Sequence, residues 1–309
     1  MYLGLDLSCY TTSCAIADEN GKIVYDERRL LNVPQGKCGL RQSEMIFEHI
    51  KNLKEIFPTG FFGIKAVGVS TRPRPVEGSY MPVFAAADSY AQVISRALGV
   101  EKTELTHQHG HIGAALLGND ALCVGNKRIL GLHVSGGTTD VLAIELLDGL
   151  IIKIDQLGQT SDISAGMLID RTGVALGCGF PAGPAIEELA KNGEILPFPS
   201  RILGCRASFS GAEAAVKRAI ADGQRKEDIA AGVLRCVANT LEKLIRNALK
   251  QTDAQCALLF GGVMCNGIIK DRLRERLSLP LYFAQRQYSS DNACGLASQT
   301  KLIFERKHT

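Results

Sequence analysis

Apolar residues recur at helical spacing along three stretches of the chain, and two of these stretches are followed by a short apolar run. Apolar positions three and four residues apart indicate the buried face of a helix, whereas a short continuous apolar run between turn signals is typical of a buried strand. Helices that alternate with buried strands predict an α/β protein. The helices are expected at 46–57, 83–97 and 234–248, and the strands at 64–69 and 257–260.

The chain contains a duplicated segment. At an offset of 127 residues, segment 3–12 aligns with segment 130–139, and six of the ten pairs are identical. Both copies have the pattern of a short buried strand, a turn of small polar residues and a second apolar strand that ends in a turn signal. Two halves built on one plan explain this pattern; chance similarity between two small-residue turns is the alternative.

Two hairpins with small-residue turns are typical of the actin-like ATPase and sugar kinase (ASKHA) fold. Small residues let backbone N–H groups approach a phosphate closely, and Ser and Thr hydroxyls add further donors. We therefore expect an α/β fold of two duplicated lobes with a cleft between them. The lobes are expected at 1–126 and 127–309, with the last helix returning toward the first lobe.

Three of the six histidines lie within five residues, at 107, 109 and 111. On a helix, His107 and His111 share a face and suit one cation, whereas His109 points roughly 200° away. A third ligand must come from elsewhere, and Asp291 is the best candidate. The alternatives are two partly exposed helix histidines and an Asp291 that only caps the last helix, expected at 293–304.

Composition narrows the classes of protein. With 309 residues, 46% of them hydrophobic and 22% charged, the chain is typical of a globular enzyme of one or two domains. No run approaches the roughly 20 apolar residues that cross a bilayer, and no basic stretch precedes an apolar one at the N-terminus. We expect a cytoplasmic protein without membrane contact. The ten cysteines form no C-x-x-C pair, so we expect reduced thiols and neither a zinc ribbon nor a disulfide scaffold.

Seven segments resemble, in order along the chain, the motifs of the tRNA threonylcarbamoyl transferases, the TsaD family once called glycoproteases. The family's H-x-x-x-H pair is similar to 107–111, and its V-S-G-G-H-T turn to 134–139. The other matches are G-x-x-x-D at 166–170, Y-P-G-G-P at 180–184, S-F-S-G at 208–211, G-G-V-x-x-N at 261–266 and D-N-x-x-x-x-A at 291–297.

The resemblance implies an activity that the spacing alone does not. Such enzymes transfer the threonylcarbamoyl group of threonylcarbamoyl-adenylate to the adenosine beside the tRNA anticodon and release AMP. It also implies one divalent metal ion, iron or zinc, and an adenylate site in which ATP or ADP are alternative occupants. The implied metal ligands are His107, His111 and Asp291; the implied nucleotide and substrate residues are Ser135, Gly136, Gly137 and Thr138 for the phosphate, Asp170 for the ribose, and Gly183 and Asn266 for the adenosine.

The chain departs from the family pattern in several places. Thr138 replaces the family's histidine in the Gly-Gly turn, Glu213 replaces a lysine, and His109 replaces an acidic residue. Segments 6–12 and 33–44 and the loop 72–79 differ as well. The metal and nucleotide positions are mostly kept, whereas the surroundings of the acceptor are not, as in a divergent family member.

Charge gives little support for RNA binding. The formal net charge is +3 and the pI about 8.3, whereas RNA-binding domains usually have a pI above about 9. The resemblance still implies tRNA and other proteins of the threonylcarbamoyl pathway as partners. The sequence leaves a dimer open. A modest basic cluster is formed by Arg201, Arg206, Lys217, Arg218, Arg225 and Lys226. An equally good interpretation of these residues is the solvated face of a helix.

Other functions stay open at this point. A related enzyme could use a carbamoyl-adenylate with an acceptor other than tRNA, and a scaffold of the same fold needs no catalysis. A kinase or ATPase holds magnesium through carboxylates and phosphates, for which a histidine pair is the wrong chemistry. A zinc protease of the H-E-x-x-H type is disfavoured because position 108 is Gln.

Overall fold

The computed structural model describes residues 1–8, 10–32, 40–60 and 63–309. Cys9 of the first turn and residues 33–39 of the divergent segment 33–44 therefore lie outside the described residues. The chain divides into two compact units, each of which is described by itself. Unit 1 consists of 1–125, 147–151 and 290–309, and unit 2 of 126–146 and 152–289.

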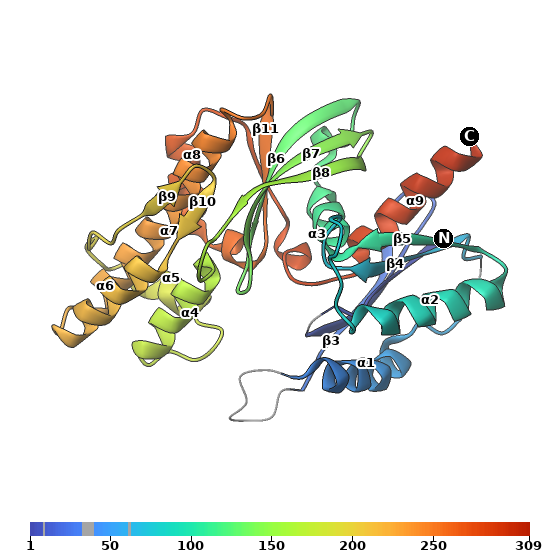
Figure 1. Ribbon diagram of the computed structural model, residues 1–309, viewed down its shortest axis with the longest axis horizontal. Coiled ribbons are helices and arrows are strands. Elements are labelled where there is room, and N and C mark those ends of the chain that lie inside the picture. The colour runs from blue at the N-terminus through green and yellow to red at the C-terminus, as the bar shows by residue number, and fades with distance from the viewer. Residues whose placement is uncertain (9, 33–39, 61–62) are drawn as a thin grey trace. The chain divides into compact units, whose positions relative to one another are not determined.

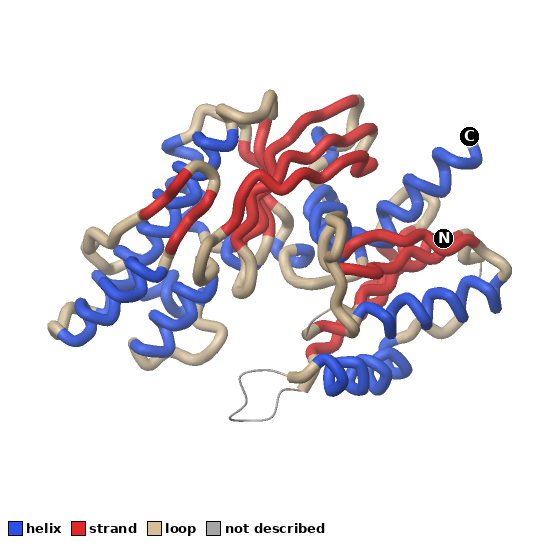
Figure 2. The backbone as a smooth tube through the Cα atoms, in the orientation of Figure 1, coloured by secondary structure: helices blue, strands red, loops and turns tan. Residues whose placement is uncertain are grey.

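Unit 1 is built on a five-stranded sheet with the order β3-β2-β1-β4-β5 (Figures 1 and 2). Strands β1, β2 and β3 are antiparallel neighbours, whereas β4 and β5 run parallel to β1. The carboxyl ends of β1, β4 and β5 therefore meet at one edge of the sheet. The strands are β1 (Tyr2–Asp6), β2 (Thr11–Ala17), β3 (Ile23–Leu30), β4 (Ala66–Arg72) and β5 (Glu101–Thr106).

Helices cover both faces of the unit 1 sheet. On one face α1 and α2 pack with alternate strand residues such as Leu5 and Val67 into a buried core. On the other face α9 packs on β1 and β4 and also on α3 (Figure 1). The helices are α1 (Gln42–Ile56), α2 (Phe84–Leu98), α3 (His107–Leu116) and α9 (Cys294–His308), with a short 3-10 turn η1 (Asp120–Leu122).

Unit 2 contains a second five-stranded sheet, with the order β12-β11-β6-β7-β8. Strand β11 runs parallel to both β6 and β12. In the unit 1 sheet the consecutive strands β3, β2 and β1 are followed by the later strands β4 and β5. The unit 2 sheet has the same arrangement, in which β8, β7 and β6 are followed by β11 and β12. The strands are β6 (Asn126–Val134), β7 (Thr139–Leu147), β8 (Leu150–Gln159), β11 (Cys256–Phe260) and β12 (Leu281–Phe283).

The core of unit 2 joins its sheet to a group of helices. The 23-residue helix α7 packs on α5 and α8 and contributes more buried apolar residues to this core than any other element. The helices are α4 (Ala165–Ala175), α5 (Gly183–Ala190), α6 (Ser210–Ala221), α7 (Lys226–Ala248) and α8 (Gly267–Arg276). The smaller elements are the pair β9 (Arg201–Leu203) and β10 (Arg206–Ser208) and the 3-10 turns η2 (Gly262–Cys265) and η3 (Arg286–Tyr288).

The helices and strands expected from hydrophobic periodicity are present. Most of their ends shift by up to four residues, but α7 begins at Lys226, eight residues earlier than expected. The two-lobed α/β fold is thus confirmed, whereas the lobe boundaries at 126 and 127 stay a prediction. The cysteines that the structure describes are free thiols. Among the described helices, none is long and apolar enough to cross a membrane.

Candidate metal centre and nucleotide pocket

Three predicted ligands, His107, His111 and Asp291, come together in unit 1. The Nε2 atoms of His107 and His111 are 2.9 Å apart, and Asp291 Oδ1 lies 3.2 Å from His111 Nε2 and 3.8 Å from His107 Nε2. A metal ion about 2.0–2.1 Å from each donor atom keeps such atoms roughly 3 Å apart. Two imidazoles and one carboxylate are a donor set that suits zinc or non-haem iron. The donor chemistry fits one ion, and the role of these residues as ligands stays a prediction.

The first turn of α3 sets the direction of the histidines. The Thr106 side chain caps this helix by accepting a hydrogen bond from the His109 N–H (3.2 Å), so His107 is the first helical residue. His107 and His111 then share one face, whereas the His109 ring turns back to Thr106 Oγ1, 2.6 Å away. Burial and the nearby charge of Arg72 lower the pKa of His109 to about 4. His109 is therefore a neutral part of the helix start.

Asp291 reaches the histidines because α9 lies unusually close to α3. A Cβ atom added to Gly295 would lie 1.9 Å from the Gly110 oxygen and 2.3 Å from the Ala114 nitrogen, so no side chain fits there. The alternative interpretation of Asp291 as a helix cap is wrong, because α9 begins at Cys294 and its N-cap is Ala293. The Asp291 carboxylate is 31% exposed, which leaves one side of the cluster open.

Asp6, at the end of β1, supports the cluster, and the sequence interpretation missed it as a site residue. The Asp6 carboxylate is buried and lies 2.7 Å from His107 Nδ1, the ring nitrogen that faces away from Asp291. Ser8 and Ser70 donate hydrogen bonds to the same carboxylate. Burial opposes a charge on His107, but the Asp6 carboxylate outweighs it and raises the pKa of His107 to about 9. A carboxylate in this position orients a ligand histidine and fixes its tautomer.

Unit 2 contains a cavity of about 500 Å³ at the carboxyl ends of the parallel strands β6 and β11. Such strand ends are the usual ligand positions of α/β sheets. Of the predicted nucleotide residues, the structure brings Gly136, Asp170, Gly183 and Asn266 to this cavity, whereas Ser135, Gly137 and Thr138 are not among its lining residues. Further lining residues that the sequence interpretation missed are Phe180, Glu187, Cys265 and Arg286.

The turn after β6 has the shape that the hairpin motif predicts. The Ser135 N–H donates to the Thr138 oxygen (2.8 Å), and the Thr138 N–H donates to Ser135 Oγ (3.1 Å). Helix α4 begins against this turn, because the Ser164 hydroxyl caps α4 and also donates to the Gly136 oxygen. A Cβ atom at Gly166 would lie 2.4 Å from the Ser135 oxygen, so glycine is needed for this approach. Backbone N–H groups at a helix start favour an anion.

Asp170 and Asn266 shape the rest of the cavity. Asp170 Oδ1 accepts a hydrogen bond from the Ala182 N–H (2.8 Å), which ties α4 to the turn before α5. Asn266 Oδ1 caps α8 through the Ile269 N–H (3.0 Å). Glu187 accepts the Gly267 N–H (2.7 Å) and so joins α5 to the same helix start. These hydrogen bonds hold the wall segments in place around the cavity.

The S-F-S-G segment is anchored by Asp162, another residue that the sequence interpretation missed. Its carboxylate accepts hydrogen bonds from Ser208 Oγ (2.6 Å) and from the Phe209 N–H (2.8 Å). Burial opposes the charge, but these hydrogen bonds outweigh it and lower the pKa of Asp162 to about 2. Glu213, where the family has a lysine, pairs with Arg171 (3.1 Å) on α4. The changed charge at position 213 thus has a partner within unit 2.

Solved structures with the same architecture define the fold class. A dehydratase activator from Clostridium difficile with bound ADPNP aligns with a TM-score of 0.60 at 16% identity, over 100% of this chain and 97% of that one. A ROK family glucokinase from Streptomyces griseus, in complex with glucose and AMPPNP, aligns with a TM-score of 0.55 at 12% identity, over 97% and 98% of the chains. The fold is therefore that of the actin-like ATPases and sugar kinases.

Sequence comparison identifies the family within this fold. The model of the family described as TsaD, tRNA N6-adenosine threonylcarbamoyltransferase, matches residues 42–298, so the chain belongs to this family of transferases.

Individual relatives agree with this assignment. A tRNA N6-adenosine threonylcarbamoyltransferase from Carboxydothermus hydrogenoformans is 31% identical over 96% of this chain and 90% of that protein. One from Chlamydia caviae is 28% identical over 98% and 91%. A probable bifunctional tRNA threonylcarbamoyladenosine biosynthesis protein from Thermoplasma volcanium is 27% identical over 98% of this chain, which spans 56% of that protein's length.

We predict that His107→Ala or His111→Ala removes the bound metal and leaves the fold intact, because each variant removes one donor atom of the set. Metal content by mass spectrometry and thermal unfolding are the measurements. His109→Ala is the matched control from the same helix turn, and it should retain the metal. Full metal retention in both ligand variants would show that the ion binds elsewhere.

We predict that Asp6→Asn weakens metal binding by about 10-fold to 100-fold, the usual effect of losing a partner of a ligand histidine. The neutral amide keeps the shape of the carboxylate but accepts the His107 hydrogen bond less well. Competition with a coloured chelator measures the dissociation constant. Exposed Asp271→Asn, on α8, is the control. An unchanged constant for Asp6→Asn would mean that His107 needs no such orientation.

Proposed function

We propose that this chain transfers a threonylcarbamoyl group from threonylcarbamoyl-adenylate to the adenosine beside the anticodon of tRNA and releases AMP. The observation that carries the proposal is the set of His107, His111 and Asp291, a cluster of ligand atoms that all lie within 4.8 Å of one another. The unit 2 cavity and the family to which the chain belongs support it. The lobes at 1–126 and 127–309 are part of the proposal.

In unit 1, His107, His111 and Asp291 hold one divalent metal, iron or zinc. Such an ion, when bound, polarises a carbonyl oxygen of the substrate as a Lewis acid. Asp6 keeps His107 in the tautomer whose Nε2 is free to bind the ion. The 31% exposure of the Asp291 carboxylate leaves room for substrate oxygens on that side.

In unit 2, the turn of Ser135, Gly136, Gly137 and Thr138 holds the phosphate through backbone N–H groups and hydroxyls. Asp170, which lines the cavity, binds the ribose hydroxyls. Gly183 and Asn266 line the adenosine part of the cavity. ATP or ADP are alternative ligands of the same site.

The protein supplies no nucleophile in this reaction. The exocyclic amine of the RNA adenosine attacks the carbamoyl carbon, the bond from that carbon to the phosphate oxygen breaks, and AMP leaves while the amine loses a proton. The residues above contribute orientation and charge stabilisation. Other proteins of the threonylcarbamoyl pathway assist in tRNA binding, which agrees with the small net charge of +3 on this chain. The reaction takes place in the cytoplasm.

The direct test supplies the purified, metal-loaded protein with threonylcarbamoyl-adenylate and unmodified tRNA, with and without cell extract. We expect threonylcarbamoyladenosine in the tRNA, detected by mass spectrometry of the nucleosides, together with one AMP per transfer. His107→Ala, which loses a metal donor, should give neither product.

Two outcomes would contradict the proposal. Release of AMP from a carbamoyl-adenylate without any modified tRNA, even with extract, would indicate an acceptor other than tRNA. Neither product in any condition, with metal bound, would indicate a scaffold without catalysis.

A further inference from the structure

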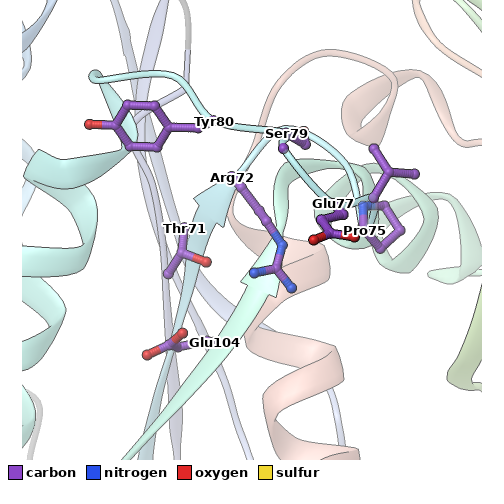
Figure 3. A pocket seen from close by; sticks show the side chains of 9 residues that line it. Thr71, Arg72, Pro75, Glu77, Ser79, Tyr80 and Glu104 are labelled. Carbon is purple, nitrogen blue, oxygen red and sulfur yellow. The ribbon is translucent and has the colours of Figure 1, made fainter.

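A second cavity lies in unit 1, at the carboxyl ends of β4 and β5, where the chain departs from the family's loop. It has a volume of about 540 Å³ and is bounded by the loop 73–80, which leaves β4 after Arg72 (Figure 3). Small-molecule sites are typically about 300–1,000 Å³, so the cavity has room for one nucleotide or a molecule of similar size. No residue of the proposed reaction above lines it.

The lining combines charge with an exposed aromatic ring. Figure 3 shows Arg72 in the middle of the cavity, with Tyr80 on one side and Glu77 on the other. In the part of the chain that the structure describes, neither Arg72 nor Glu77 has an ion-pair partner, whereas Glu104 pairs with Lys102 (3.0 Å). Tyr80 is 68% exposed. The cavity therefore offers an unpaired donor group, an unpaired acceptor group and a flat apolar surface.

The loop that forms this cavity is tied to the metal cluster. The Gln108 N–H donates to the Pro73 oxygen (3.1 Å), and Gln108 directly follows His107 in the first turn of α3. The Arg74 N–H donates to Ser79 Oγ (3.1 Å), which closes the loop on itself. Both the cavity and the cluster belong to unit 1. A ligand in the cavity would thus contact a loop that is hydrogen-bonded to the first turn of the helix that carries the histidines.

The chemistry of this lining fits an unpaired nucleobase better than a simple anion. Two carboxylates, Glu77 and Glu104, disfavour a bare phosphate. A base has a π-face for Tyr80, acceptor atoms for the Arg72 guanidinium and N–H groups for the Glu77 carboxylate. Proteins recognise single-stranded RNA in this way, by stacking splayed bases on aromatic side chains and hydrogen-bonding their edges.

We propose that Arg72, Glu77 and Tyr80 form a subsite for a base of the acceptor RNA that flanks the modified adenosine. This inference rests on the proposed function, since it assigns the residues that position its acceptor. It also gives a physical role to a loop that differs from the family pattern.

The test compares Tyr80→Leu and Arg72→Gln with controls on exposed positions of neighbouring helices, Phe47→Leu on α1 and Arg96→Gln on α2. An unmodified anticodon stem-loop RNA is the probe. We expect each cavity variant to raise the dissociation constant of this RNA about 10-fold, because stacking on a base or hydrogen-bonding to it is lost. The KM for tRNA in the transfer reaction should rise about 10-fold as well. The controls, and the affinity for an adenylate analogue, should not change.

Photo-cross-linking with a halogenated base in the anticodon loop locates the contact directly. We expect cross-links to the peptide that contains 72–80 in the wild type and fewer in Tyr80→Leu. Cross-links elsewhere only, or cavity variants that equal the controls while the wild type still modifies tRNA, would overturn the subsite alone. If the wild type neither binds the RNA nor modifies tRNA, both the subsite and the proposed function fail.

Discussion

The close contact between α3 and α9 is the constraint on which the candidate metal centre depends. His107 and His111 share a helix, but Asp291 comes from a distant part of the chain and reaches them only because α9 lies against α3. Gly295 permits this approach, since any Cβ there would overlap the backbone of Gly110. The close packing of α9 on α3 thus adds a carboxylate to two neighbouring imidazoles.

The sheet of unit 1 gathers the remaining groups at the same edge. Parallel strands β1, β4 and β5 end at Asp6, Arg72 and Thr106. Asp6 supports His107, Thr106 starts the helix of both histidines, and Arg72 opens the loop of the second cavity. Strand ends therefore supply an orienting carboxylate, a helix cap and a candidate acceptor contact. The unit 2 sheet repeats the principle, with the Ser135 turn after β6 and Gly262 after β11.

Local patterns predicted much of this from the sequence. Periodicity located α1, α2 and α7, the internal repeat indicated two lobes, and the i, i+4 spacing selected His107 and His111 over His109. Asp6 was missed because a buried strand-end aspartate looks like any turn residue until the fold brings His107 beside it. Asp162 was missed for the same reason, since its partners lie 46 and 47 residues away. The apparent cap role of Asp291 was wrong because the helix begins later, at Cys294.

Anomalous diffraction from crystals of the metal-loaded protein locates the bound ion directly. With data collected at the absorption edge of the metal, we expect one strong peak between His107 Nε2, His111 Nε2 and the Asp291 carboxylate. A peak bound by other residues, or none at this position although the protein in solution carries one equivalent of metal, would contradict this expectation.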